Sequence, residues 1–171
     1  LSPNFKILTG VEHWFFMKER LFEFELDYYR PLGNPTAFID ALLKTFARLK
    51  EELNAPEDVI QFSKNYELRI TNDEEKFEAK RLMELAKAYQ RYQELMTEGG
   101  FLDFADLHFK TLELFDRRPN ILAHLQNRYK YILVDEYQDT NIAQNRIVDR
   151  LAEKHRNLTV VGDDDQAIYK F

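Results

Sequence analysis

Cysteine is absent from this chain of 171 residues. Its absence excludes a disulfide framework and a thiolate metal site, and it fits a reducing compartment. No apolar run approaches the roughly 20 residues that a membrane-spanning helix needs, and no secretory signal pattern opens the chain. We therefore expect a cytoplasmic protein that makes no contact with a membrane.

An excess of positive charge is also lacking, since 24 basic residues face 30 acidic ones and the net charge is −6. Nucleic-acid clamps bind chiefly through Lys and Arg, so the balance argues against a dedicated clamp and leaves room for local basic grooves. Hydrophobic residues make up 44% of the chain, which is enough for the core of one ordinary domain or two small ones. The chain begins at Leu1 rather than Met and stops inside a motif, so we expect a piece of a longer polypeptide.

The first hundred residues carry helical periodicity. Apolar residues spaced by three and four predict one or two helices over 11–29 and another after Asn34–Pro35. The latter carries an apolar face made of Phe38, Leu42, Phe46, Leu49 and Leu53. A short helix is predicted from Pro56 to about residue 65. A long one follows the capping-box spacing of Thr71 and Glu74 and ends at Gly99–Gly100. The buried stripe of the long helix is predicted to be Phe77, Leu82, Leu85, Tyr89, Tyr92 and Met96.

Beyond the glycines the pattern changes to mixed helix and strand. Asp103 and Asn120 are predicted caps of two further helices, the first with Phe104, Leu107, Thr111, Leu114 and Phe115 facing inward. Strands are predicted over 129–134 and 158–161, with a crossover helix over 142–155, which together make a parallel βαβ unit. We therefore expect a mixed α/β fold that is mostly helical, with one domain over 1–100 and another over 101–171.

Each of the two predicted strands ends in a run of carboxylates. The first is followed by Asp135 and Glu136, and the second by Gly162 and an aspartate triplet that leads to Gln166. Parallel sheets bind ligands at the carboxyl ends of their strands. Nucleotide hydrolysis needs a carboxylate near Mg²⁺ and a residue that positions the attacking water. The pattern therefore favours a nucleotide site, with Gln166 placed to sense a γ-phosphate.

Simpler interpretations stay open at this point. The Asp135–Glu136 pair is equally typical of a solvated acidic loop, and Gln166 of a polar turn that caps a helix. The aspartate triplet lacks the spacing, glycine and final glutamate of a calcium-binding EF-hand. Tyr169 and Phe171 suit either base stacking on single-stranded nucleic acid or a place in the core. The four histidines show no metal-ligand spacing.

The two motifs together carry a resemblance to a known family. Residues 134–141, Val-Asp-Glu-Tyr-Gln-Asp-Thr-Asn, and residues 161–171, Val-Gly-Asp-Asp-Asp-Gln-Ala-Ile-Tyr-Lys-Phe, closely resemble motifs II and III of superfamily 1 DNA helicases of the UvrD/Rep/PcrA type. Residues 102–107 look like the segment that re-enters the family's first motor domain. Residues 32–58 are similar to its inserted helical subdomain. The resemblance implies a helical inserted subdomain over 1–100 and part of a RecA-like motor domain, a P-loop NTPase fold, over 101–171.

The resemblance also implies roles for individual residues. Asp135 would hold Mg²⁺, Glu136 would orient or deprotonate the hydrolytic water, and Gln166 would contact the γ-phosphate of ATP. Tyr169 and Phe171 would lie against single-stranded DNA, and a duplex junction would be a further partner of the enzyme. Gln138 and Asp139 would link the ATP site to neighbouring motifs, and the remaining motor domains of the same polypeptide would complete the enzyme.

Two departures from the family pattern bear on activity. The phosphate-binding loop G-x-x-x-x-G-K-[ST] does not occur in the chain, so the backbone cradle and lysine that bind the β- and γ-phosphates are missing. Ala167 stands where the family usually has Ser. We therefore expect the chain to be an inactive part of an ATP-dependent helicase. Two alternatives remain: a helical module that binds DNA or protein without catalysis, and a subunit that pairs with a separate P-loop protein.

Overall fold

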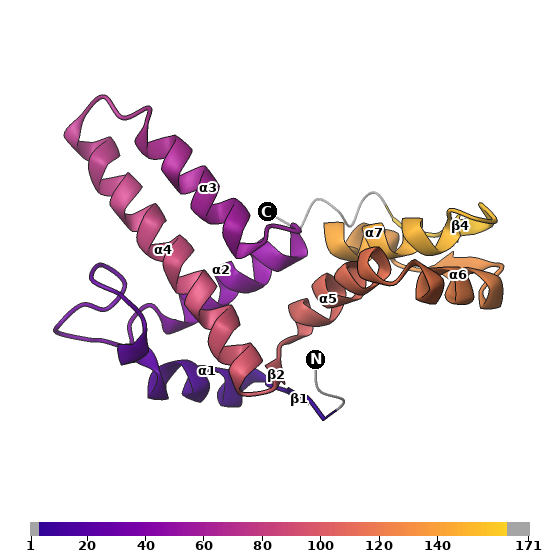
Figure 1. Ribbon diagram of the computed structural model, residues 1–171, viewed down its shortest axis with the longest axis horizontal. Helices are drawn as coiled ribbons and strands as arrows, with labels where there is room; N and C mark the ends of the chain where they lie inside the picture. Colours follow the sequence, from indigo (N-terminus) through magenta and orange to yellow (C-terminus); the bar gives the residue numbers. More distant parts are fainter. Residues whose placement is uncertain (1–3, 164–171) are drawn as a thin grey trace. The chain divides into compact units, whose positions relative to one another are not determined.

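The computed structural model describes residues 4–163, and these residues divide into two compact units. The helical unit comprises residues 4–50 with Asn54–Asp106, and the α/β unit comprises Glu51–Leu53 with residues 107–163. Figure 1 labels the helices of both and most of their strands. The predicted mixed α/β fold, mostly helical, is confirmed. The assignment of 1–100 to an inserted subdomain and of 101–171 to a motor domain stays a prediction.

The helical unit is enclosed between two short strands that pair with each other. Strand β1 (Lys6–Ile7) runs parallel to β2 (Phe101–Leu102), with Lys6 opposite Phe101 and Ile7 opposite Leu102. Between them lie α1 (Gly10–Glu19), the 3₁₀ turn η1 (Leu21–Glu23), α2 (Ile39–Glu51), α3 (Pro56–Glu67) and α4 (Asp73–Glu98). Helices α3 and α4 form a hairpin (Figure 1). The segment 8–100 therefore begins and ends at the same small parallel ladder.

Aromatic side chains fill the core of the helical unit. Phe46 of α2 stacks on Tyr89 of α4 with ring centroids 5.3 Å apart, and it also meets Tyr92 at 5.0 Å. Phe16 of α1 packs edge-on against Tyr92. All four rings are buried. Such offset and edge-on pairs contribute about 0.5–1.5 kcal/mol each beyond the apolar area they bury, so they tie α1, α2 and α4 together.

The α/β unit holds the predicted βαβ arrangement. Helices α5 (Phe104–Arg117, which begins in the helical unit) and α6 (Pro119–Arg128) precede β3 (Ile132–Val134), and α7 (Ile142–Ala152) connects β3 to β4 (Leu158–Val160). The strands pair in parallel with Leu133 opposite Thr159. Leu112, Phe115, Leu122 and Ala143 form the buried centre of this unit. The predicted strands were too long by one to three residues at their ends.

Several local predictions were wrong in detail. Helix α2 begins at Ile39 rather than at Pro35, because residues 35–38 form turns after Asn34. Helix α4 is capped by Asn72, whose side chain accepts from the Glu75 amide at 2.8 Å, and not by Thr71. Arg118 rather than Asn120 precedes α6 as its N-cap residue.

Two predicted inward faces were also wrong in part. Phe77 on α4 is 52% exposed, and Phe104 and Leu114 on α5 are 61% and 42% exposed. The buried residues of α4 include three alanines that the prediction left out, Ala79, Ala86 and Ala88, beside the predicted Tyr89, Tyr92 and Met96. The spacing rule assigns large apolar residues to the buried face, whereas positions where a neighbouring helix approaches closely favour small residues.

Candidate functional site

The β3–β4 pair brings the two acidic loops together at one edge. The Val161 amide donates to the Val134 carbonyl at 2.8 Å, and the Tyr137 amide donates back to the Val161 carbonyl at 2.9 Å. These bonds extend the parallel ladder beyond the strands. They seat the turn that contains Asp135 and Glu136 directly beside Gly162.

The backbone at Glu136 is left-handed, with φ 50° and ψ 44°. A residue with a Cβ pays an energetic penalty in this region, and such outliers concentrate at functional sites. The turn is held by the Glu136 amide, which donates to Asp135 Oδ1 at 3.0 Å. Both side chains are exposed. The conformation bends the chain directly after β3, and two adjacent carboxylates therefore follow the end of the strand.

Gln138 bridges the two loops with its side-chain amide. Its Nε2 donates to Glu136 Oε2 at 2.5 Å, and its Oε1 accepts from the Asp163 amide at 3.0 Å. Gly162 leaves room for this contact, because a Cβ there would lie 2.7 Å from Gln138 Oε1. One side chain thus connects the Glu136 carboxylate to the backbone of the neighbouring strand's loop.

The far end of the first loop is fixed to α7. Thr140 Oγ1 donates to the Tyr137 carbonyl at 2.6 Å and is 2.8 Å from Asn145 Oδ1. Asn141 and Gln144 form a reciprocal capping box at the start of α7, at 2.9 and 3.0 Å. Capping of this kind stabilises a helix by about 1 kcal/mol. The loop therefore has fixed anchors at β3, at β4 and at α7.

Asp135 and Glu136 suit a magnesium ion that keeps some of its waters better than a metal whose ligands all come from the protein. Within residues 4–163, no group of three or more His, Cys, Asp or Glu side chains is arranged to hold a metal. Mg²⁺ keeps several waters and commonly binds one or two carboxylates together with substrate phosphates. The exposed pair Asp135 and Glu136 fits that pattern. Gln166, Tyr169 and Phe171, which the sequence also singled out, lie outside the described residues.

A second cluster of charge is buried in the helical unit. Lys50 is completely buried, and its Nζ lies 2.6 Å from Asp103 Oδ2 and 2.8 Å from Asp106 Oδ1. The Tyr92 hydroxyl donates to Asp103 Oδ2 at 2.7 Å, and His13 Nε2 is 2.6 Å from that hydroxyl. Asp103 and Asp106 also accept each other's backbone amides at the start of α5, at 2.8 and 2.9 Å. We call these five residues the Lys50 cluster.

Burial and charge act on the ionisable groups of this cluster. Burial raises the pKa of Asp103, but the charge and hydrogen bond of Lys50, with the Tyr92 hydroxyl, outweigh it and hold the pKa below its usual value. Burial lowers the pKa of His13, and the Lys50 charge adds to this. The sequence indicated Asp103 as a cap but missed Lys50. Lys50 continues the buried face of α2 four residues after Phe46, and a lysine on such a face was the available signal.

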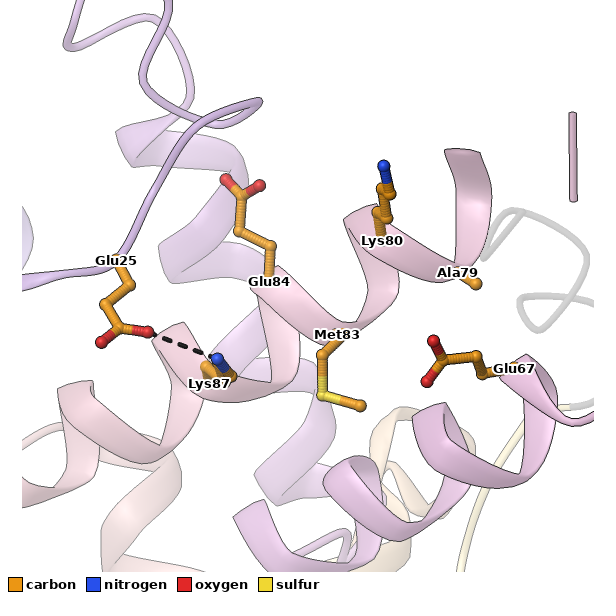
Figure 2. A pocket seen from close by; sticks show the side chains of 7 residues that line it. All are labelled: Glu25, Glu67, Ala79, Lys80, Met83, Glu84 and Lys87. Atoms are coloured by element: carbon orange, nitrogen blue, oxygen red, sulfur yellow. Dashed lines mark hydrogen bonds and ion pairs between the residues drawn. The ribbon is translucent and has the colours of Figure 1, made fainter. Parts of the chain in front are cut away.

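A pocket of about 230 Å³ lies on the helical unit beside α4 (Figure 2). Its polar groups are largely engaged in holding the loop that precedes α2. The Glu84 carboxylate accepts from the amides of Asp27, Tyr28 and Tyr29 at 2.9–3.2 Å, and Lys87 pairs with Glu25 at 3.3 Å. The polar residues that line this pocket therefore hold a loop in place, and we assign the pocket no functional role.

Comparison with known proteins decides the family. Residues 6–171 match the family model described as UvrD/REP helicase N-terminal domain. The chain belongs to the UvrD/REP helicase family. Similar proteins include the ATP-dependent DNA helicase PcrA of Bacillus subtilis, 36% identical over 172 residues and 100% of this chain. The PcrA proteins of Staphylococcus epidermidis and Staphylococcus aureus are 37% and 36% identical over 169 residues, or 99% of the chain. The resemblance drawn from residues 131–171 is thereby confirmed.

The chain spans 20% of the length of these relatives. Within residues 4–163, none of the helices has the length and apolar character required to cross a bilayer. Membership of the UvrD/REP family places the acidic edge in a family whose named relatives are ATP-dependent DNA helicases.

Proposed function

We propose that this chain is the part of an ATP-dependent DNA helicase that supplies the carboxylates for ATP hydrolysis. The enzyme that contains it couples hydrolysis to movement along single-stranded DNA and to separation of the duplex. The proposal rests on one observation above all. In a chain of the UvrD/REP family, the parallel β3–β4 pair gathers Asp135, Glu136 and the Gly162 loop at a single carboxyl edge.

The chemistry proposed for this edge is the one that the family resemblance implies, and the geometry of the two loops is compatible with it. Mg²⁺ bound with ATP would neutralise the phosphate charge that develops during hydrolysis. Asp135, free of any cation partner among the described residues, would hold that ion directly or through water. Glu136, turned back by its left-handed backbone, would accept a proton from the attacking water. Gln138 would position Glu136 and would couple it to the neighbouring loop through the Asp163 amide.

The remaining roles fall on residues outside the described range and on other segments. Gln166 would contact the γ-phosphate, and Tyr169 and Phe171 would lie against single-stranded DNA. The phosphate-binding loop that this sequence lacks would come from the rest of the first motor domain, and the remaining motor domains of the same polypeptide would complete the enzyme. We place the protein in the cytoplasm, and we expect the chain alone to be inactive.

A steady-state ATPase assay with single-stranded DNA tests the proposal. It compares the 171-residue chain with a longer polypeptide that contains it. We expect no turnover by the chain alone and turnover by the longer polypeptide. Glu136→Gln should abolish that turnover, because the amide cannot accept the proton, whereas Glu153→Gln should leave it unchanged.

Two results would contradict the proposal. Turnover by the chain alone that disappears in Glu136→Gln would show that no further phosphate-binding segment is needed. Full turnover by the longer polypeptide carrying Glu136→Gln would remove Glu136 from the reaction.

A further inference from the structure

Basic and tyrosine side chains gather at the edge of the β3–β4 pair opposite the carboxylates. Residues 127–131, ahead of β3, read Asn-Arg-Tyr-Lys-Tyr, and residues 154–157, ahead of β4, read Lys-His-Arg-Asn. The four Lys and Arg side chains and both tyrosines are exposed. We call Arg128, Tyr129, Lys130, Tyr131, Lys154 and Arg156 the basic–tyrosine patch.

Hydrogen bonds join the two segments into one surface. Lys154 Nζ donates to Asn127 Oδ1. Asn157 Nδ2 donates to the Lys130 carbonyl at 2.9 Å, and the Ile132 amide donates to the Asn157 carbonyl at 2.9 Å. Since β3 and β4 are parallel, both segments lie at the same amino edge of the pair. The patch is therefore built within the α/β unit by two loops of fixed register.

The charges of the patch are not neutralised by ion pairs. Among residues 4–163, none of its four cations lies within salt-bridge distance of a carboxylate, although Glu153 adjoins Lys154 in the sequence. Arg150, by contrast, pairs with Asp116 at 2.8 Å one turn earlier. In a chain of net charge −6, four unpaired cations on two short loops are a local concentration of positive charge. Such a surface attracts polyanions.

The tyrosines give the patch a second chemical property. Tyr131 is 76% exposed and Tyr129 is 46% exposed, and the Arg128 guanidinium lies 5.5 Å from the centre of the Tyr129 ring. Exposed rings set among cations are typical of surfaces that bind single-stranded nucleic acid, where bases stack on the rings and cations meet phosphates. An acidic polypeptide would use the cations and leave both rings unused.

We propose that the basic–tyrosine patch binds single-stranded nucleic acid, through phosphate contacts to its four cations and base stacking on Tyr131. This contact lies at the opposite edge of the β3–β4 pair from the carboxylates, and its residues differ from those proposed to meet DNA in the preceding section. This proposal rests on the proposed function only in that both name single-stranded nucleic acid as a partner. The contact requires neither ATP nor Mg²⁺.

Fluorescence anisotropy of a labelled thymidine oligonucleotide, with no ATP or divalent ion present, tests the proposal on the 171-residue chain. Affinity is measured over a series of salt concentrations. One variant changes the four cations of the patch to Gln. The matched control removes the same charge elsewhere and changes Lys44, Lys64, Arg69 and Lys80 to Gln, all of them exposed.

Each phosphate contact on a single strand contributes about −0.7 to the slope of log K against log salt. Losing two to four contacts should make the slope less negative by about 1.4–2.8 in the patch variant, and by well under 1 in the control. Tyr131→Ala should weaken binding by about fivefold or more, whereas Tyr131→Phe, which keeps the ring, should bind as the unchanged chain does.

Three outcomes would overturn the proposal. Equal losses in the patch variant and the control would show general charge attraction. An unchanged affinity of the Tyr131→Ala variant would show that no base stacks on Tyr131. Poly-glutamate and unlabelled oligonucleotide are also compared as competitors at equal concentrations of negative charge. Equal displacement of the labelled oligonucleotide by the two would favour an acidic polypeptide as the partner. Because the assay contains no ATP, none of these results depends on whether Glu136 takes part in hydrolysis. Failure of this proposal can therefore be distinguished from failure of the proposed function.

Discussion

Replacing Lys50 by Met should destabilise the helical unit by about 3–5 kcal/mol. Met has nearly the length of Lys and fills the same space, so packing changes little. The cost arises because Asp103 and Asp106, 5% and 1% exposed, would stay buried without the ammonium that lies 2.6 and 2.8 Å from them. An uncompensated buried carboxylate is far more costly than the loss of an exposed ion pair, which is worth about 0–1 kcal/mol.

Urea unfolding measures this cost, and Trp14, the single tryptophan, reports on the helical unit. Lys44→Met is the control, because Lys44 is exposed on the same helix and should shift stability by less than about 0.5 kcal/mol. Adding Asp103→Asn and Asp106→Asn to Lys50→Met should restore part of the loss, since the amides need no counter-charge. A cost below about 1 kcal/mol for Lys50→Met would refute the reasoning, and so would further destabilisation by the two Asn changes.

Three further predictions concern other contacts. Because burial lowers the pKa of His13 below 6.5, the unfolded chain binds more protons; stability should therefore fall as pH drops below 6.5, and His13→Gln should flatten this slope in urea titrations at pH 5–7. Gly162→Ala should displace the Gln138 side chain and shift its amide NMR signals while costing under about 1 kcal/mol, because a flexible side-chain end is what must move; unshifted signals would contradict the bridge. Asn72→Ala should cost about 1 kcal/mol in thermal unfolding by loss of the α4 cap, whereas Thr71→Ala should cost less.

Much of the fold follows from local rules that the sequence states openly. Pro56 begins α3, Gly99 ends α4, and apolar runs ending in acids mark β3 and β4. The errors arise where the sequence leaves several local options open. Glu75 serves as the capping partner of Asn72 while also accepting from the Thr71 amide and hydroxyl, so the cap lies one residue later than the Thr71–Glu74 spacing suggests.

The candidate site was predictable in composition and not in geometry. Adjacent acids after a strand predict a ligand edge, but the left-handed turn at Glu136 depends on the bonds between Val134, Tyr137 and Val161 across the two strands. The Lys50 cluster was hidden for the opposite reason. Periodicity treats a lysine as a surface residue, and its burial is made possible by Asp103 and Asp106, which are more than fifty positions away in the sequence.

The parallel pairing of β1 with β2 limits how the helical unit can be changed. Strands that run in the same direction cannot be joined by a tight turn, and a connection between them needs a dozen or more residues. Since Lys6 and Ile7 lie opposite Phe101 and Leu102, everything from residue 8 to residue 100 serves as that connection. A two-residue linker from Ile7 to Phe101 could not keep the two strands parallel, so any shortened version must retain a connection of a dozen or more residues between them.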